Sequence, residues 1–276
     1  MQRADRLFSV AAAVVAALVA MVPLLILWQL LQAGAPMLGL DFLLQAPQEG
    51  GRAGGIASIL LSTLWVLGVC LVFALPLGLG AALFLVESIN AHGRLGRTLQ
   101  LALDVLGGVP SIVFGLFGNR VFCVELGMGF SILSGGLTLA CMVMPLFVRA
   151  AEQAMRACPI SYRQGVAALA LSRWGYVRRI LLPYAAPGIA VGLVLAAGRA
   201  LAETAVLLFT AGYVMRRPEG WMDSGRTLAV HIYDLSMNVT GGAAAASASA
   251  LVLLALSLSI VAVAQGWTHR FQKGRS

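Results

Sequence analysis

Six long runs of apolar residues divide the chain, and short polar segments separate them. The runs cover residues 8–31, 56–86, 99–124, 132–148, 185–212 and 243–265. Each run holds between 17 and 31 residues, and roughly 20 residues suffice for a helix to cross the hydrocarbon layer of a membrane. The pattern therefore predicts an all-α polytopic membrane protein with six transmembrane helices.

The first run differs from a cleaved signal sequence. Arg3 and Arg6 precede it, and residues 33–35 resemble a small-residue cleavage site. However, the apolar core of a signal peptide is only about 7–15 residues long. We therefore expect an uncleaved first helix, which forms a unit of residues 1–55 with the polar loop after it. The remaining five helices would form a core domain of residues 56–276.

The composition excludes a soluble domain. Hydrophobic residues make up 60% of the chain and charged residues 11%, with a mean hydropathy of +0.90. A soluble domain carries roughly 25% charged residues, so too few polar side chains are present to cover a surface in water. The net charge of +8 does not indicate nucleic acid, because 18 of the 19 basic residues are arginines placed mostly at the ends of apolar runs. That placement is typical of topology determinants.

The distribution of basic residues predicts the orientation. Alternating the sides of six helices places both termini, residues 87–97 and residues 149–183 on one side. That side carries 13 basic residues and the other side five, with Arg199 inside a helix. Since basic residues are retained on the cytoplasmic side, we expect both termini to be cytoplasmic and the protein to lie in a bacterial inner membrane.

The chain offers few catalytic signatures. A P-loop needs a lysine after its glycine-rich turn, and the only lysine, Lys273, has no such loop before it. The three histidines are too far apart for an H-E-x-x-H helix, and no C-x-x-C pair is present. We therefore expect a protein that is not an enzyme and that holds no cofactor and no metal. Its cysteines would be structural: Cys70, Cys123, Cys141 and Cys158.

Arg199 and Glu203 are charged residues inside the fifth apolar run. Their spacing of four residues places both on one face of a helix, within reach of an ion pair. Each charge near the middle of a membrane costs about 2.5–3.5 kcal/mol, so both should face the bundle interior or a watery cavity. Two interpretations stay open. The pair locks helices together, or Arg199 binds an anion in a pathway, since guanidinium matches oxyanions bidentately.

The third run contains further pathway candidates. Gly107-Gly108-Val109-Pro110-Ser111 predicts a broken helix, because Pro110 removes one backbone donor. Non-helical backbone at membrane depth is tolerated only where protein or a water-filled cavity surrounds it. Pro110 and Ser111 therefore either line a path or form a simple kink. Asp104 either lines that path or lies near the cytoplasmic surface with a local partner such as Arg97.

The polar segment of residues 149–183 is rich in arginine. It holds six arginines against one acid, Glu152. Apolar residues recur in it at helical spacing and predict an amphipathic helix outside the membrane: Val166, Leu169, Val177 and Leu181. This stripe would either lie on the lipid surface or dock in a groove of a cytoplasmic partner.

Part of this segment resembles the EAA loop of ABC-importer permeases. The family pattern is E-A-A, three residues, G, nine residues and I-x-L-P, and both the spacing and the final Ile180, Leu182 and Pro183 match. Gln164 replaces the Glu and Ala170 the Gly. The resemblance implies a helix seated in an ATPase subunit, with altered coupling, since Ala170 disfavours a left-handed turn by roughly 1 kcal/mol. The coupling residues it implies are Arg163, Gln164, Gly165, Leu169, Ala170, Ile180 and Pro183.

Further stretches are similar to the phosphate-specific permease pair of that family: residues 76–82, 108–118, 198–205 and 207–212, the last typical of the PstA-type member. Over residues 54–235 the resemblance implies the type I, MetI-like permease fold. It also implies an importer that moves phosphate from periplasm to cytoplasm by alternating access, with Arg199 meeting the anion. The implied partners are a PstC-type second permease, a homodimeric ATP-binding subunit and a periplasmic phosphate-binding protein.

Three alternatives stay open. The same machine could carry another oxyanion, such as phosphonate, sulfate or molybdate. A secondary anion carrier would need no ATPase and should show internal repeats, which we do not find. An intramembrane enzyme would need a polar catalytic cluster, for which the sequence offers only the pair of Arg199 and Glu203.

Overall fold

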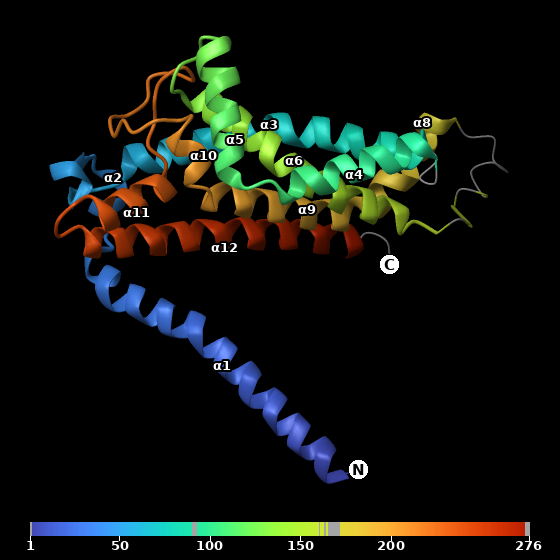
Figure 1. Cartoon of the computed structure of the whole chain (residues 1–276), viewed down its shortest axis with the longest axis horizontal. Helices are drawn as coiled ribbons and strands as arrows, with labels where there is room; N and C mark the ends of the chain where they lie inside the picture. The colour runs from blue at the N-terminus through green and yellow to red at the C-terminus, as the bar shows by residue number, and fades with distance from the viewer. Residues whose placement is uncertain (1, 90–92, 160, 163, 165–171, 274–276) are drawn as a thin grey trace.

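The computed structural model describes residues 2–89, 93–159, 161–162, 164 and 172–273, and its fold is helical (Figure 1). The longest elements are α1 (Gln2–Gly34), α3 (Ala57–Glu87), α4 (Arg94–Gly108), α6 (Ile132–Arg156), α9 (Leu182–Ala202) and α12 (Ala243–Lys273). The shorter ones are η1 (Ala35–Met37), α2 (Leu40–Leu44), β1 (Pro47–Gln48), η2 (Glu49–Gly51), β2 (Ala53–Gly54), α5 (Ser111–Gly118), η3 (Asn119–Glu125), α8 (Arg173–Tyr176), η4 (Val177–Leu181), α10 (Ala205–Leu208) and α11 (Leu228–Met237).

The number of membrane spans agrees with the hydrophobic pattern. Within the described residues, five helices are long and apolar enough to cross a membrane: Ala12–Met37, Ala57–Glu87, Ile132–Arg156, Arg173–Ala202 and Ala243–Gly266. A sixth span passes the same test only as a bent pair, in which α4 and the segment Ser111–Glu125 meet at 97°. The prediction of an all-α protein with six spans is confirmed, with one of the six broken.

The core of the bundle forms where α6 packs against both α3 and α9. Small residues allow this close approach: Gly136 of α6 faces Val69 of α3, and Gly192 of α9 faces Ala150 of α6. Small residues at helix contacts are the usual way in which transmembrane helices gain packing, because lipid provides no hydrophobic drive between them. α6 begins at a regular cap, since the Ser131 hydroxyl accepts a hydrogen bond from the Ser134 amide.

The two ends of the bundle differ, as Figure 1 shows. One end, called here the α8 end, carries α8 and the end of α12. The other, called here the α11 end, carries α2 and α11. Helix α1 leaves the bundle at the α11 end and runs away from it, with its apolar window unburied by the rest of the chain. It touches the bundle where Gly34 lies against Ala248 of α12.

At the α11 end a histidine is sealed inside the protein. His231 on α11 is fully buried, with the Gly51 backbone against its ring, and neither ring nitrogen has a hydrogen-bond partner among the residues that the structure describes. Burial, followed by the positive charge of Arg226, lowers the pKa of His231 to about 4, and Asp234 opposes that shift weakly. The imidazole is therefore neutral in the folded protein at neutral pH.

This burial makes stability depend on pH. Between about pH 6.5 and pH 4 the unfolded chain holds a proton on His231 that the folded chain lacks, so the free energy of unfolding falls as the pH falls. The expected loss is roughly 3 kcal/mol, complete by about pH 4. Thermal unfolding in detergent across this range measures it. His231→Leu should flatten the dependence, and an unchanged slope in that variant would assign the effect to other groups.

Candidate functional site

The first feature of the candidate site is a break in the third span. α4 ends at Gly108, where the Val109 amide donates to the Leu106 carbonyl, and α5 begins at Ser111 directly after Pro110. Proline cannot continue the hydrogen-bond ladder, and the two helices meet at 97°. The predicted broken helix is therefore present. Pro110 is exposed at the bend, and Ser111 is half-buried at the start of α5.

A second break interrupts the fifth span. α9 ends at Ala202, Glu203 adopts an extended conformation (φ −75°, ψ 126°), and α10 begins at Ala205. Glu203 is therefore the cap of α9, and the backbone leaves the helix after its side chain. The two side chains still meet, with 3.8 Å between Arg199 Nε and Glu203 Oε1.

The second halves of the two broken spans pack on each other. Gly115 of α5 lies so close to α10 that a Cβ there would be 3.1 Å from the Val206 Cα. Asn119 donates from Nδ2 to the Phe209 carbonyl at 2.7 Å, where α10 ends. Non-helical backbone within a membrane needs protein or water around it. Two breaks joined through α5 and α10 are therefore the place in this chain where a polar path is expected.

Arg199 is not sealed in apolar packing. Its side chain is 35% exposed and that of Glu203 is 15% exposed. Among the described residues, Glu203 is its single acidic partner, and the 3.8 Å separation is long for a charge-assisted hydrogen bond. The guanidinium therefore keeps donors available for a further anionic group. The ion pair and an anion-binding role are both compatible with this geometry.

Asp104 lies on α4, beside α6. It accepts two hydrogen bonds from Arg149, at 3.1 Å from Nε and 2.6 Å from Nη2, while its own side chain stays 64% exposed. The suggested partner, Arg97, was therefore the wrong one. The reason is that α6 runs alongside α4 and brings Arg149 to Asp104.

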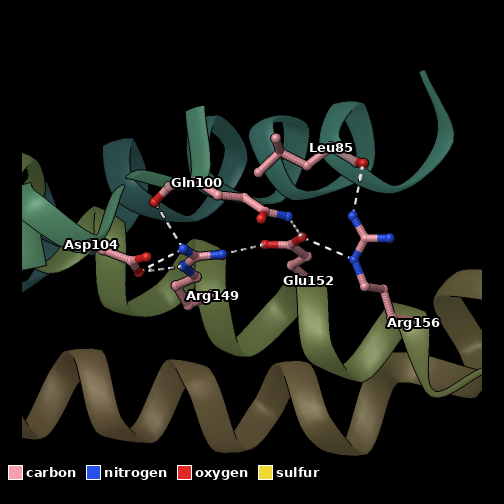
Figure 2. Close-up of polar contacts among 6 residues, drawn as sticks. All are labelled: Leu85, Gln100, Asp104, Arg149, Glu152 and Arg156. Carbon is pink, nitrogen blue, oxygen red and sulfur yellow. Dashed lines mark hydrogen bonds and ion pairs between the residues drawn. The ribbon is translucent and has the colours of Figure 1, made fainter. Parts of the chain in front are cut away.

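Figure 2 shows that Asp104 belongs to a larger polar network. Glu152 of α6 lies at its centre with a side chain only 4% exposed, and it accepts hydrogen bonds from Arg149 and Arg156. The remaining contacts reach Gln100 of α4 and the Leu85 carbonyl of α3. From the sequence Glu152 is expected to be an acid of the polar segment 149–183, and its role in this network is not predicted. The signal was the spacing of residues 149, 152 and 156, which places all three on one helical face.

The segment expected as a coupling loop is shorter than residues 149–183. α6 continues to Arg156; Ser161, Tyr162 and Gln164 are helical, and α8 begins at Arg173. Arg149 and Arg156 belong to α6 because they pair along its face with Glu152.

The structure describes only some of the implied coupling residues. Arg163, Gly165, Leu169 and Ala170, together with Val166 of the apolar stripe, lie outside the described residues. Gln164 is exposed, Ile180 is half-buried in η4, and Pro183 lies in the first turn of α9. Val177 and Leu181 are buried in a cluster with Leu85 of α3 and Val148 of α6. That half of the stripe therefore packs within the chain and does not face a partner.

Comparison with known proteins agrees with this architecture. A family model described as the inner membrane component of binding-protein-dependent transport systems matches residues 74–270. The chain belongs to this family. The permease is 32% identical over 216 residues to the "Probable ABC transporter permease protein YqgI" of Bacillus subtilis (strain 168), covering 74% of this chain and 73% of that relative.

A second relative of the permease is named for phosphate. The "Phosphate transport system permease protein PstA 1" of Mycobacterium tuberculosis (strain CDC 1551 / Oshkosh) is 40% identical over 161 residues, which cover 58% of this chain and about half (52%) of that protein. A chain of the MetNI methionine ABC transporter, solved in an inward-facing conformation, matches with a TM-score of 0.63 at 18% identity over 76% of this chain and 93% of that one. The predicted MetI-like fold and the PstA-type resemblance are both confirmed.

Proposed function

We propose that this permease is the membrane subunit of an ATP-driven importer of inorganic phosphate. The observation that carries the proposal is the meeting of two broken spans, with the partly exposed Arg199 at one of the breaks. A partly exposed guanidinium at a helix break provides charge and paired donors for an oxyanion. The similarity to a relative named for phosphate transport supports phosphate as that oxyanion.

Arg199 and Glu203 would act together on the anion. When the path is empty, Glu203 balances the charge of Arg199 from 3.8 Å. When phosphate arrives, it competes for the same guanidinium, and Glu203 then repels it. Such competition keeps binding strong enough for entry and weak enough for release, as transport requires.

Energy would reach this site from a separate subunit. In the proposed assembly a PstC-type permease completes the path, an ATPase homodimer binds the exposed part of the segment 149–183, and a periplasmic protein delivers phosphate. The 13 basic residues on the side of both termini support placing the α8 end in the cytoplasm. ATP binding would then open the path outward, in alternating access, and hydrolysis would reset it.

Phosphate-stimulated ATP turnover of the purified complex tests this function. The complex, isolated through this chain and placed in lipid vesicles, should hydrolyse ATP faster when the binding protein and phosphate are added, and should accumulate labelled phosphate. Sulfate, molybdate and phosphonate are the competitors. If one of these anions, and not unlabelled phosphate, inhibits uptake, that anion is the substrate. Uptake without ATP would indicate a secondary carrier.

A further inference from the structure

One carboxylate joins three helices at the α8 end. Glu152 Oε1 is 2.9 Å from Arg156 Nε, and Glu152 Oε2 is 3.3 Å from Arg149 Nη1. Arg156 extends the network to α3 by donating to the Leu85 carbonyl at 3.2 Å. Arg149 extends it to α4, where it donates to the Gln100 carbonyl at 2.8 Å and to Asp104. The positive charges of the two guanidinium groups equal the negative charges of the two carboxylates, so burial of Glu152 leaves no uncompensated charge.

This network is the main fixed attachment of α4 to the bundle. Within α4, all of which the structure describes, Gly96 is the one buried residue. Leu99 and Leu103 pack only partly against the core, while Leu101 and Val105 are about three-fifths exposed. A helix with so little buried apolar area gains little from packing. The contacts of α4 to Arg149 and Glu152 therefore decide where it lies.

The C-terminal end of α4 leads directly into the bend at Pro110. Residues 109 and 110 are extended, and Pro110 provides no amide to bridge the bend. Asp104 lies one turn before α4 ends. A displacement of α4 at the network therefore changes the angle at Pro110, directly before α5. α5 in turn contacts α10, which follows Glu203.

We propose that Glu152, with Arg149 and Asp104, is the linkage that carries movement of the end of α6 to the two helix breaks. Glu152 lies one turn before α6 ends at Arg156. When a force moves the end of α6, the network passes the movement to α4 and onward to α5. These are positioning residues that act through α4, and the inference rests on the proposed function for its energy source.

Hydrogen exchange of the α4 amides tests the linkage without assuming the substrate. In the wild-type complex, trapping ADP and vanadate on the ATPase should change exchange across residues 94–108. In Glu152→Gln the charge-assisted bonds to both arginines weaken, and the nucleotide-dependent change should shrink by about threefold or more. Phosphate transported per ATP, measured on the same complex, should fall by about five- to tenfold while ATP hydrolysis continues.

Two further variants keep the test sharp. Asp104→Asn alters a side chain that is 64% exposed, so it should leave folding intact yet reproduce the loss, and Asp104→Glu should restore it. Glu49→Gln is the matched control, because Glu49 pairs with Arg52 at 2.6 Å outside the network. Wild-type exchange and coupling in both Glu152→Gln and Asp104→Asn would overturn the linkage. A different result would overturn only the assignment of phosphate as substrate. In that case hydrogen exchange of α4 in the wild-type complex responds to nucleotide, but phosphate does not stimulate ATP hydrolysis.

Discussion

Phosphate uptake is expected to fall by at least about 100-fold when Arg199 is replaced by alanine, because two charge-assisted hydrogen bonds of roughly 1.5–3 kcal/mol each would be lost. The same change leaves Glu203, only 15% exposed, without its counter-charge beside the path. Arg199→Lys keeps the charge but not the planar pair of donors, so an intermediate loss of about tenfold is expected. Initial rates of labelled phosphate uptake into vesicles that hold the assembled complex measure both effects.

Assembly must be shown to survive these changes. Recovery of the other subunits with each variant provides that check, since Arg199 lies at a helix end with its side chain 35% exposed. Arg52→Ala is the matched control: it removes an arginine from an exposed pair with Glu49 and should leave uptake unchanged. Undiminished uptake in Arg199→Ala would exclude Arg199 from the mechanism and reduce its pair with Glu203 to a structural contact.

The helix breaks could be predicted from the sequence because their causes are local. Proline at position 110 lacks an amide wherever it is placed, and two adjacent glycines before it weaken the helix further. Similarly, apolar run length alone predicts spans, since the required thickness is a property of the membrane. The extended conformation of Glu203 was not predictable in this way, because no proline or glycine marks it and neighbouring helices determine where α9 ends.

The polar network escaped prediction because it depends on distant pairing. Asp104 and Arg149 are 45 residues apart, and nothing in either local sequence identifies the other. For the same reason the sequence predicts that the helix ends before Arg149, whereas α6 continues to Arg156. A charged stretch suggests a loop when its partners are unknown, but Arg149, Glu152 and Arg156 satisfy one another and α4 while the helix continues. The spacing of residues 149, 152 and 156 predicts their pairing within one helix. The contacts to α4 depend on how α4 packs on α6, which the local sequence does not show.

Gly136→Ala is expected to lower the free energy of unfolding by about 2–3 kcal/mol, a large effect for a single methyl group. A Cβ at residue 136 would lie 2.5 Å from the Cβ of Val69 and 3.0 Å from the Val66 carbonyl oxygen. Neither atom can rotate away, so α3 and α6 would have to separate along the central contact of the bundle. Gly68→Ala, on α3 with open space around the new methyl group, should instead be neutral or stabilising by up to about 1 kcal/mol through helix propensity. Thermal unfolding of both variants in the same detergent compares them directly. Equal unfolding temperatures would mean that the two helices do not approach at Gly136 as closely as described.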